Sequence, residues 1–389
     1  MAADDSSPTS VPETAHSPST AEVAMRRMDV DAKQDAVAKL LHDAQCDGLL
    51  IQQPANFRWL TAGAEPVGLR GADERPALFF NPTQRWLISA AADTQRFFDE
   101  ELDRLGFQVK EWAWTASREQ LLADLVFNRK VATDTPFRDC RDVSSHFLNA
   151  RRHLSLYEWD KLRALGKLVA HAVEACARNV TKGESEEEIA GHLAHRLLRH
   201  GVHPESLQVS GDGRGRPHRR RDFSPAPVTQ WATLQATGRM DGLFATCSRT
   251  VSFGKLDPSI RGEFDLALRL GATHIATAKA GEKVTAALDA GKLLLRPTPH
   301  EHEWRLTPMV ALTGREPSEG FFPPTTTETW HDGWAAVWQE RIGAAAVVDT
   351  FLLHAEGWEN VTPTEDWPVR RAVFQGRKYD RADVLVRSG

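Results

Sequence analysis

The loop from Val209 to Arg221 gathers several residue types that could do chemistry. Gly213 and Gly215, in Gly-Asp-Gly-Arg-Gly-Arg, have the backbone freedom that a phosphate-cradling loop needs. No strand-to-helix context surrounds these glycines, so we do not assign a nucleotide-binding loop. The loop also contains His218, but an isolated imidazole in a polar loop is most often simply solvated. Basic residues cluster from Arg214 to Arg221, and the functional meaning of this cluster depends on the elements that position it.

Composition limits the classes of partner that the chain can have. The 389 residues are comfortable for two domains, and 41% apolar residues are enough for two ordinary cores. A formal net charge of −5 creates no global field that would attract nucleic acid or an anionic membrane, although the basic cluster is a local exception. No apolar run approaches the length of about eighteen residues that a membrane span needs. We therefore expect no nucleic-acid partner and no membrane partner.

The four cysteines point to a reducing compartment. They are far apart in the sequence, form no Cys-x-x-Cys pair, and no apolar core of a signal peptide precedes them. The interpretation that fits these observations is a cytoplasmic protein in which each thiol is a small buried apolar group rather than a ligand or a nucleophile. The residues are Cys46, Cys140, Cys176 and Cys247.

A β-hairpin is predicted from Thr233 to Gly254. Two apolar runs flank a turn-forming segment that contains Asp241-Gly242, and an Asp-Gly pair between alternating hydrophobic residues is a strong hairpin signal. Because side chains on paired strands share a face, such a hairpin could hold polar groups of both strands over one site.

The surrounding sequence divides into three parts. Residues 1–29 are rich in Ala, Ser, Thr, Pro and acidic residues, so we expect a disordered tail. Residues 30–150 alternate apolar strand runs with helical patterns and predict an α/β domain with a covered sheet. Residues 151–389 begin with a helix that carries a regular apolar stripe, followed by Ser185 and Glu188, whose spacing forms a capping box for a helix at Glu186 to His200.

Several segments resemble, in the correct order, a known family of proteins. The segment Gly242-Leu243-Phe244-Ala245-Thr246-Cys247-Ser248-Arg249-Thr250 resembles the second strand of the signature hairpin of the pita-bread metallopeptidases, the family of Xaa-Pro aminopeptidase (prolidase), methionine aminopeptidase and creatinase. Residues 47–63 are similar to the opening of the N-terminal domain of prolidases and creatinases, and Arg151 to Glu158 to the junction that follows it. The resemblance implies an α/β N-terminal creatinase/prolidase-type domain and an α+β pita-bread C-terminal domain.

The resemblance also implies where metal ligands would lie. In the peptidases of this family two Mn, Co or Zn ions share five ligands, and four of those positions are degenerate here. They read Gln235, Thr246, Thr307 (or the adjacent Pro308) and Val348 in this chain. A carboxylate is a hard anionic ligand, whereas an amide and a hydroxyl are neutral and weak, and a Val side chain has no lone pair. The fifth position, a Glu before a Pro, falls on Glu316, and His300 and His302 could replace the missing His only by a shift of register. We therefore expect no metal cofactor.

Two functions remain open under this resemblance, with a third behind them. The first is a catalytically inactive binding protein, or pseudoenzyme, for a small molecule or a short peptide. The second is a metal-free C–N hydrolase similar to creatinase, in which His218 would be the acid/base, although Arg220 fits some spacings of the family's loop His equally well. Glu316 would assist His218 in catalysis, and Arg249 and Arg315, with Arg341, would hold the substrate. The third is an active Xaa-Pro metalloaminopeptidase whose ligands are misaligned here. A homodimer is expected in each case.

Overall fold

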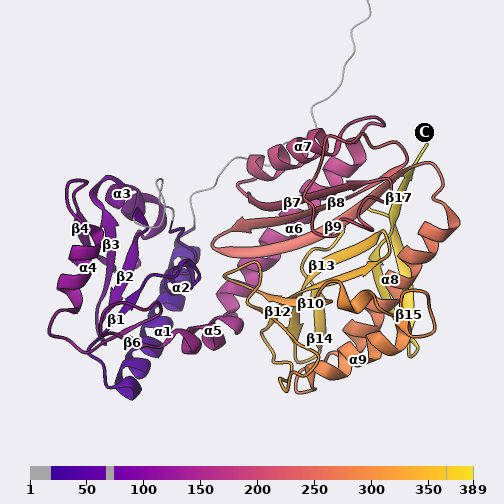
Figure 1. Cartoon of the computed structure of the whole chain (residues 1–389). Coiled ribbons are helices and arrows are strands. Elements are labelled where there is room, and N and C mark those ends of the chain that lie inside the picture. Colours follow the sequence, from indigo (N-terminus) through magenta and orange to yellow (C-terminus); the bar gives the residue numbers. More distant parts are fainter. Residues whose placement is uncertain (1–18, 67–73, 365, 389) are drawn as a thin grey trace, which may run out of the picture.

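The protein has two lobes of unequal size. A computed structural model describes residues 19–66, 74–364 and 366–388, and Figure 1 shows a smaller N-terminal domain beside a larger C-terminal domain. The N-terminal domain contains, in chain order, α1 (Thr20–Ala44), β1 (Gly48–Ile51), α2 (Pro54–Leu60), β2 (Ala77–Phe80), β3 (Arg85–Ala90), α3 (Ala91–Arg96), the π-helix η2 (Phe97–Glu101), β4 (Gln108–Trp112), α4 (Arg118–Val126), β5 (Val131–Thr133), β6 (Arg141–Asp142) and α5 (Ser144–Arg152).

Helix α1 begins earlier than the sequence suggested. Residues 20–29, which we expected in the disordered tail, form its first turns, while residues 1–18 lie outside the described part of the chain. Ser19 caps the helix by accepting a hydrogen bond from the backbone of Glu22. Arg26 donates to the carbonyls of Thr61 and Ala62, so tertiary contacts hold a segment whose composition alone would not order it.

The N-terminal sheet is mixed and covered on both faces. Its six strands lie in the order β4-β3-β2-β1-β5-β6, with β1 antiparallel to β2 and parallel to β5. All residues of the central strands β1 and β2 are buried, as expected for a sheet between two helical layers. Two apolar clusters, one around Leu41 and Phe57 and one around Leu122, fill its two sides. This arrangement confirms the predicted α/β domain.

The described part of the C-terminal domain is built from two large sheets, a separate two-stranded sheet of β15 and β16, and two pairs of helices. Its elements are α6 (Leu156–Asn179), α7 (Glu186–Arg199), β7 (His203–Gly211), β8 (Trp231–Met240), β9 (Leu243–Phe253), α8 (Pro258–Thr277), α9 (Val284–Leu295), the 3-10 helix η3 (Glu303–Arg305), β10 (Val310–Thr313), β11 (Gly320–Phe321), β12 (Ala335–Ile342), β13 (Ala345–His354), β14 (Gly357–Asn360), β15 (Val369–Phe374), β16 (Arg377–Ala382) and β17 (Val384–Arg387).

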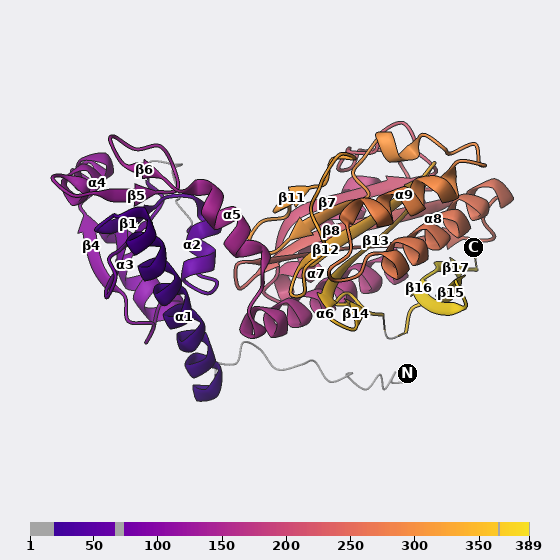
Figure 2. The same cartoon turned by 90° about the horizontal axis from the view of Figure 1, so that it is seen from below.

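The two sheets lie between the two helix pairs. One sheet has the order β17-β9-β8-β7 and is covered by α6 and α7, and the other has the order β11-β10-β12-β13-β14 and is covered by α8 and α9 (Figures 1 and 2). An apolar cluster lies under each helix pair. Both helix pairs shield one face of a sheet, so the polar positions of β8, β9, β12 and β13 are directed toward the seam between the sheets. This two-layer arrangement is the pita-bread fold.

The helix signals in the sequence are confirmed here. Ser185 and Glu188 form the predicted capping box at the start of α7, and Ser155 and Glu158 form a second one at the start of α6. Among the described residues, no helix is both long and apolar enough to span a membrane.

Candidate functional site

The hairpin predicted from the sequence is formed by β8 and β9. Asp241 and Gly242 both have positive φ, which is the conformation of a two-residue hairpin turn. The register places Gln235 opposite Ser248 and Thr237 opposite Thr246, so these side chains lie on one face of the hairpin. Gln235 and Thr246, the two hairpin positions that the resemblance assigns to metal ligands, are therefore neighbours.

Thr246 is committed to hydrogen bonds within the protein. Its hydroxyl lies 2.9 Å from the hydroxyl of Thr237, and its backbone N–H donates to the hydroxyl of Thr350 on β13. Thr350 in turn donates to the backbone carbonyl of Thr246. This reciprocal pair joins the two sheets, and it places a neutral group where the family has a carboxylate.

The register of β12 and β13 identifies a position that the sequence did not reveal. Gln339 lies directly opposite Val348, the position at which the family has a bridging Glu. An ion held at Val348 would thus have an amide, not a second carboxylate, as its nearest cross-strand neighbour. The available signal was Gly343-Ala344 between two apolar runs, because a two-residue turn at this place pairs Gln339 with Val348.

Glu316, which the sequence suggested as the fifth ligand, lies in the loop after β10 instead. The hydroxyl of Thr313 donates to the carbonyl of Glu316, and burial followed by the charge of Glu319 raises the pKa of Glu316. Thr307 is partly buried in the bend before β10, two residues from Met309, whose carbonyl accepts the N–H of Gln339. The backbone near Thr307 thus reaches strand β12 at Gln339, whereas Glu316 does not line the cavity beside Gln235.

An arginine from β12 points into the seam beside Gln235. Nη2 of Arg341 donates to Oε1 of Gln235 at 2.6 Å and to Oε1 of Gln208 at 3.0 Å. Gln208 and Gln235 are directly paired on β7 and β8. Among the described residues, no carboxylate lies within ion-pairing distance of this guanidinium. Burial, and then repulsion from Arg219, lowers the pKa of Arg341 to about 10.

A small cavity of about 30 Å³ lies next to these three residues. The segment predicted as a loop from Val209 to Arg221 belongs to strand β7 as far as Gly211 and is a loop only after it. This loop forms the other wall of the cavity, with His218, Arg219 and Arg221 among the lining residues, but not Arg220. His218 is exposed at the cavity, and its backbone carbonyl accepts the N–H of Arg221. Among the described residues no Asp or Glu lines the cavity.

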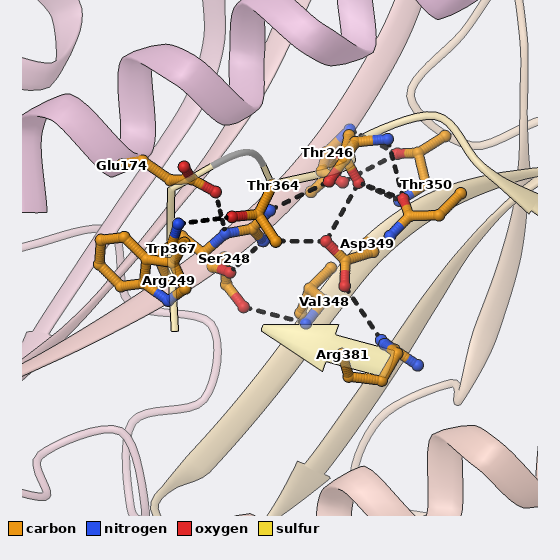
Figure 3. Close-up of polar contacts among 12 residues, drawn as sticks. Glu174, Thr246, Ser248, Arg249, Val348, Asp349, Thr350, Thr364, Trp367 and Arg381 are labelled. Carbon is orange, nitrogen blue, oxygen red and sulfur yellow. Dashed lines mark hydrogen bonds and ion pairs between the residues drawn. The ribbon is translucent and has the colours of Figure 1, made fainter. Parts of the chain in front are cut away.

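Arg249, predicted to bind substrate, lies in a different environment. It is 2% exposed, and its guanidinium donates to Glu174 at 2.8 Å, to Asp349 at 2.9 Å and to the carbonyl of Thr362 (Figure 3). Burial opposes its charge, but Asp349 and Glu174 more than compensate and raise the pKa of Arg249.

This pairing continues on the other side of Asp349. Arg381 lies 3.1 Å from Asp349 and 3.5 Å from Glu340, which faces the ring of His274. We call this set the buried ion-pair network; its members are Glu174, Arg249, Asp349, Arg381 and Glu340. Beside this network, Figure 3 shows a hydrogen bond that joins β9 to β13. The backbone N–H of Val348 donates to the hydroxyl of Ser248.

Arg315, the second predicted substrate-binding residue, is fully buried at the junction of the two domains. It donates to Glu158 at 2.6 Å and to the carbonyl of Asp241 in the hairpin turn. Glu158 also accepts a bond from Lys33 of α1 at 2.8 Å. The structure therefore does not bring Arg249, Arg315 or Glu316 to the cavity of His218, and their assignment to substrate binding or catalysis remains only a prediction.

The residues present do not fit a pair of divalent metal ions. Hard cations need several anionic oxygens, and the degenerate ligand positions offer one amide, two hydroxyls and an alkyl group, with the amide of Gln235 bonded to the cationic Arg341. In the described ranges, no group of three or more His, Cys, Asp or Glu side chains could hold a metal. His300, considered as a substitute ligand, instead lies 3.5 Å from Glu303 and 4.0 Å from Glu263.

Comparison with known proteins gives a family match over part of the chain and a shared fold. Residues 160–295 match the description Metallopeptidase family M24. No curated protein matches the sequence. The X-Pro aminopeptidase from Thermotoga maritima superposes with a TM-score of 0.73 at 15% identity, covering 91% of this chain and 99% of the other.

Two further solved structures show how broadly this fold is used. For the prolidase from Pyrococcus furiosus the TM-score is 0.70 at 13% identity, with 84% of this chain and 99% of the other covered. For the N-terminal domain of the FACT complex subunit SPT16 from Cicer arietinum (chickpea) the TM-score is 0.65 at 12% identity, with 88% and 96% covered.

Proposed function

Because residues 160–295 carry a Metallopeptidase family M24 domain on the fold of the Xaa-Pro peptidases, we propose that the chain is a homologue of those enzymes that has lost the two-metal centre and acts as a binding protein. One observation carries this proposal. Arg341 donates to Gln235, the residue at the first ligand position, so a permanent positive charge lies where the family would concentrate positive metal ions.

Electrostatics explains why Arg341 beside Gln235 and a pair of metal ions exclude each other. Two unit charges about 4 Å apart repel by about 4 kcal/mol in a partly buried site, and a divalent ion doubles that repulsion. No carboxylate at Gln235, Thr246, Gln339 or Val348 offsets it. The fold itself leaves the function open, because it also occurs in a domain whose name identifies it as part of a complex subunit rather than a peptidase.

The ligand class and the assembly are part of the same proposal. We expect a small molecule or a short peptide as the ligand, and a homodimer in the cytoplasm follows the family pattern. Size-exclusion chromatography with light scattering tests the dimer directly: a monomer at all concentrations would contradict it.

The test of lost metal binding is metal content together with hydrolysis. The protein, purified without chelator, is measured by elemental analysis before and after incubation with Mn²⁺, Co²⁺ and Zn²⁺, and each sample is assayed with an Xaa-Pro dipeptide. We expect substoichiometric metal and no hydrolysis. Two ions per chain with hydrolysis would overturn the proposal and would mean that other residues supply the ligands.

A second function has one observation in its favour, namely that His218 lines the cavity beside Gln235 and Arg341. Metal-free C–N hydrolysis would use this imidazole as acid/base. An imidazole of this kind is normally oriented by a carboxylate, and none lines the cavity among the described residues. Creatine hydrolysis by the wild type that disappears in His218→Ala, with unchanged folding, would establish this function in place of pure binding.

A further inference from the structure

The cavity between β8, β12 and the loop at residues 212–222 has an unusual charge balance. Three of its lining residues are arginines, Arg219, Arg221 and Arg341, and His218 adds a fourth group that can carry positive charge. The other polar side chains of the lining are neutral; they are those of Gln208, Ser210, Thr233 and Gln235. A site that concentrates guanidinium groups without a lining carboxylate is suited to an anion.

Arg341 supplies the first directed donor. Nη2 is engaged with both glutamines, which fixes the plane of the guanidinium. Among the described residues no carboxylate forms an ion pair with Arg341, and burial and the charge of Arg219 lower its pKa. A buried or half-buried charge without a counterion is costly, so an external anion would complete this site.

Arg219 supplies the second donor, and its unpaired nitrogen atoms support an anion site independently of Arg341. Its side chain is only 10% exposed, and Nη2 lies 2.5 Å from Glu303. The other two nitrogen atoms, Nε and Nη1, are buried and have no hydrogen-bond partner. Buried guanidinium donors are rarely left unpaired, because an unsatisfied buried donor has lost its water without gaining a partner. These donors belong to a residue that lines the cavity, so a ligand inside it would satisfy them.

The size of the cavity selects the part of the ligand that can enter. About 30 Å³ holds one or two water molecules, which is the size of a small oxyanion group rather than of a peptide. The exposed residues His218 and Arg221 lie where a larger ligand would leave the cavity. The nearby acids Glu263 and Glu303 pair with Arg216 and Arg219 and are not lining residues, so they do not close the site to an anion.

We propose that this cavity binds the oxyanion end of a small ligand, a carboxylate or a phosphate, through Arg341 and Arg219. The proposal rests on the proposed function, because it assigns to a cavity lined by Gln235, one of the degenerate ligand positions, a ligand of opposite charge to the lost ions. The planar, forked donors of a guanidinium match both a carboxylate and a phosphate, so experiment must decide which of the two anions binds.

The experiment is calorimetric titration of the full chain with inorganic phosphate and, separately, with acetate, at fixed ionic strength balanced by sodium chloride. We expect saturable binding of one anion per chain for at least one of the two, and the stronger one identifies the source. Arg219→Gln and Arg341→Gln should weaken this binding by about tenfold or more, the loss expected for a charge-assisted hydrogen bond. Arg220→Gln is the matched control, since Arg220 lies in the same loop and does not line the cavity.

Further measurements separate binding from folding. Each variant is checked by circular dichroism and by its Tm without anion, and Arg341→Lys should retain part of the affinity because it keeps the charge but not the fork. If Arg341→Gln does not fold, Arg219→Gln against Arg220→Gln decides. No saturable binding of either anion, or equal losses for Arg219→Gln and Arg220→Gln, would overturn the inference.

Metal analysis of the same preparation keeps the two proposals apart. A metal-loaded, hydrolytic protein contradicts the proposed function whatever the titration gives. A metal-free protein that binds neither anion contradicts the anion site alone.

Discussion

Two arginines near the seam between the sheets, Arg249 and Arg341, have opposite surroundings. Arg249 contacts two carboxylates, Glu174 and Asp349, and its pKa is raised, whereas Arg341 contacts two amides and its pKa is lowered to about 10. The first belongs to a network in which charges compensate each other, which is how buried charges are normally retained. The second is left without compensation inside the protein, which is typical of groups reserved for a ligand.

The strongest way to break this comparison is Arg249→Met. Removing the cation would leave Glu174 and Asp349 buried without their partner, so we expect a loss of about 3–5 kcal/mol in the free energy of unfolding. Urea denaturation followed by tryptophan fluorescence measures it. A loss below about 1 kcal/mol would show that the buried ion-pair network contributes no more than a surface pair.

Glu158→Gln tests the other buried charge cluster, at the domain junction. The Lys33 and Arg315 charges outweigh the cost of burial and lower the pKa of Glu158 to about 2. A depressed carboxyl pKa contributes stability above the unfolded value of about 4.5, and that stability is lost as the pH falls toward 2. We expect Glu158→Gln to cost on the order of 3 kcal/mol at pH 7 and to flatten the stability profile between pH 4.5 and 2. Denaturation curves across this pH range, compared with wild type, would refute the assignment if the two profiles ran parallel.

Thr350→Val is a smaller perturbation at the seam. It removes the hydroxyl that accepts from the N–H and donates to the carbonyl of Thr246 but keeps the shape of the side chain. Two buried backbone groups would lose a partner, and we expect a loss of about 1–3 kcal/mol. Thermal denaturation measures this, with Thr325→Val, at an exposed loop position of the same chain, as a control expected to change little. An unchanged Tm for Thr350→Val would mean that the strands do not depend on this link.

Arg341→Met should have the smallest effect on the ligand-free protein, within about 1 kcal/mol of wild type or more stable, because it removes an uncompensated charge. The measurement is the same urea titration used for Arg249→Met, so the two variants are directly comparable. A loss as large as that of Arg249→Met would abolish the distinction between the two arginines.

Local signals in the sequence predicted the elements but not the distant contacts between them. The Asp241-Gly242 turn and the Ser185 capping box were correct because their energetics lie within a few residues. The pairing of Gln339 with Val348 could have been counted from the turn at Gly343, but the contact of Arg341 with Gln235 depends on how two sheets meet, which no local pattern encodes.

The arginines illustrate the same limit. Arg249, Arg315 and Arg341 have the same chemistry in the sequence, and only tertiary structure separates a guanidinium held by Glu174, one held by Glu158 and one held by amides. Helix α1 began before the predicted boundary for a related reason, since Arg26 reaches carbonyls that are more than thirty residues away.

Strand β17 is the edge strand of the sheet that contains the β8–β9 hairpin, and it is synthesised long after the hairpin. It pairs in parallel with β9, Val384 opposite Thr250, although more than a hundred residues of chain separate them. During synthesis on the ribosome, β9 would remain an open edge until β17 emerges, and such a high contact order slows folding. In that interval the exposed edge of β9 is prone to pairing with another nascent chain, so β17 protects this edge against aggregation.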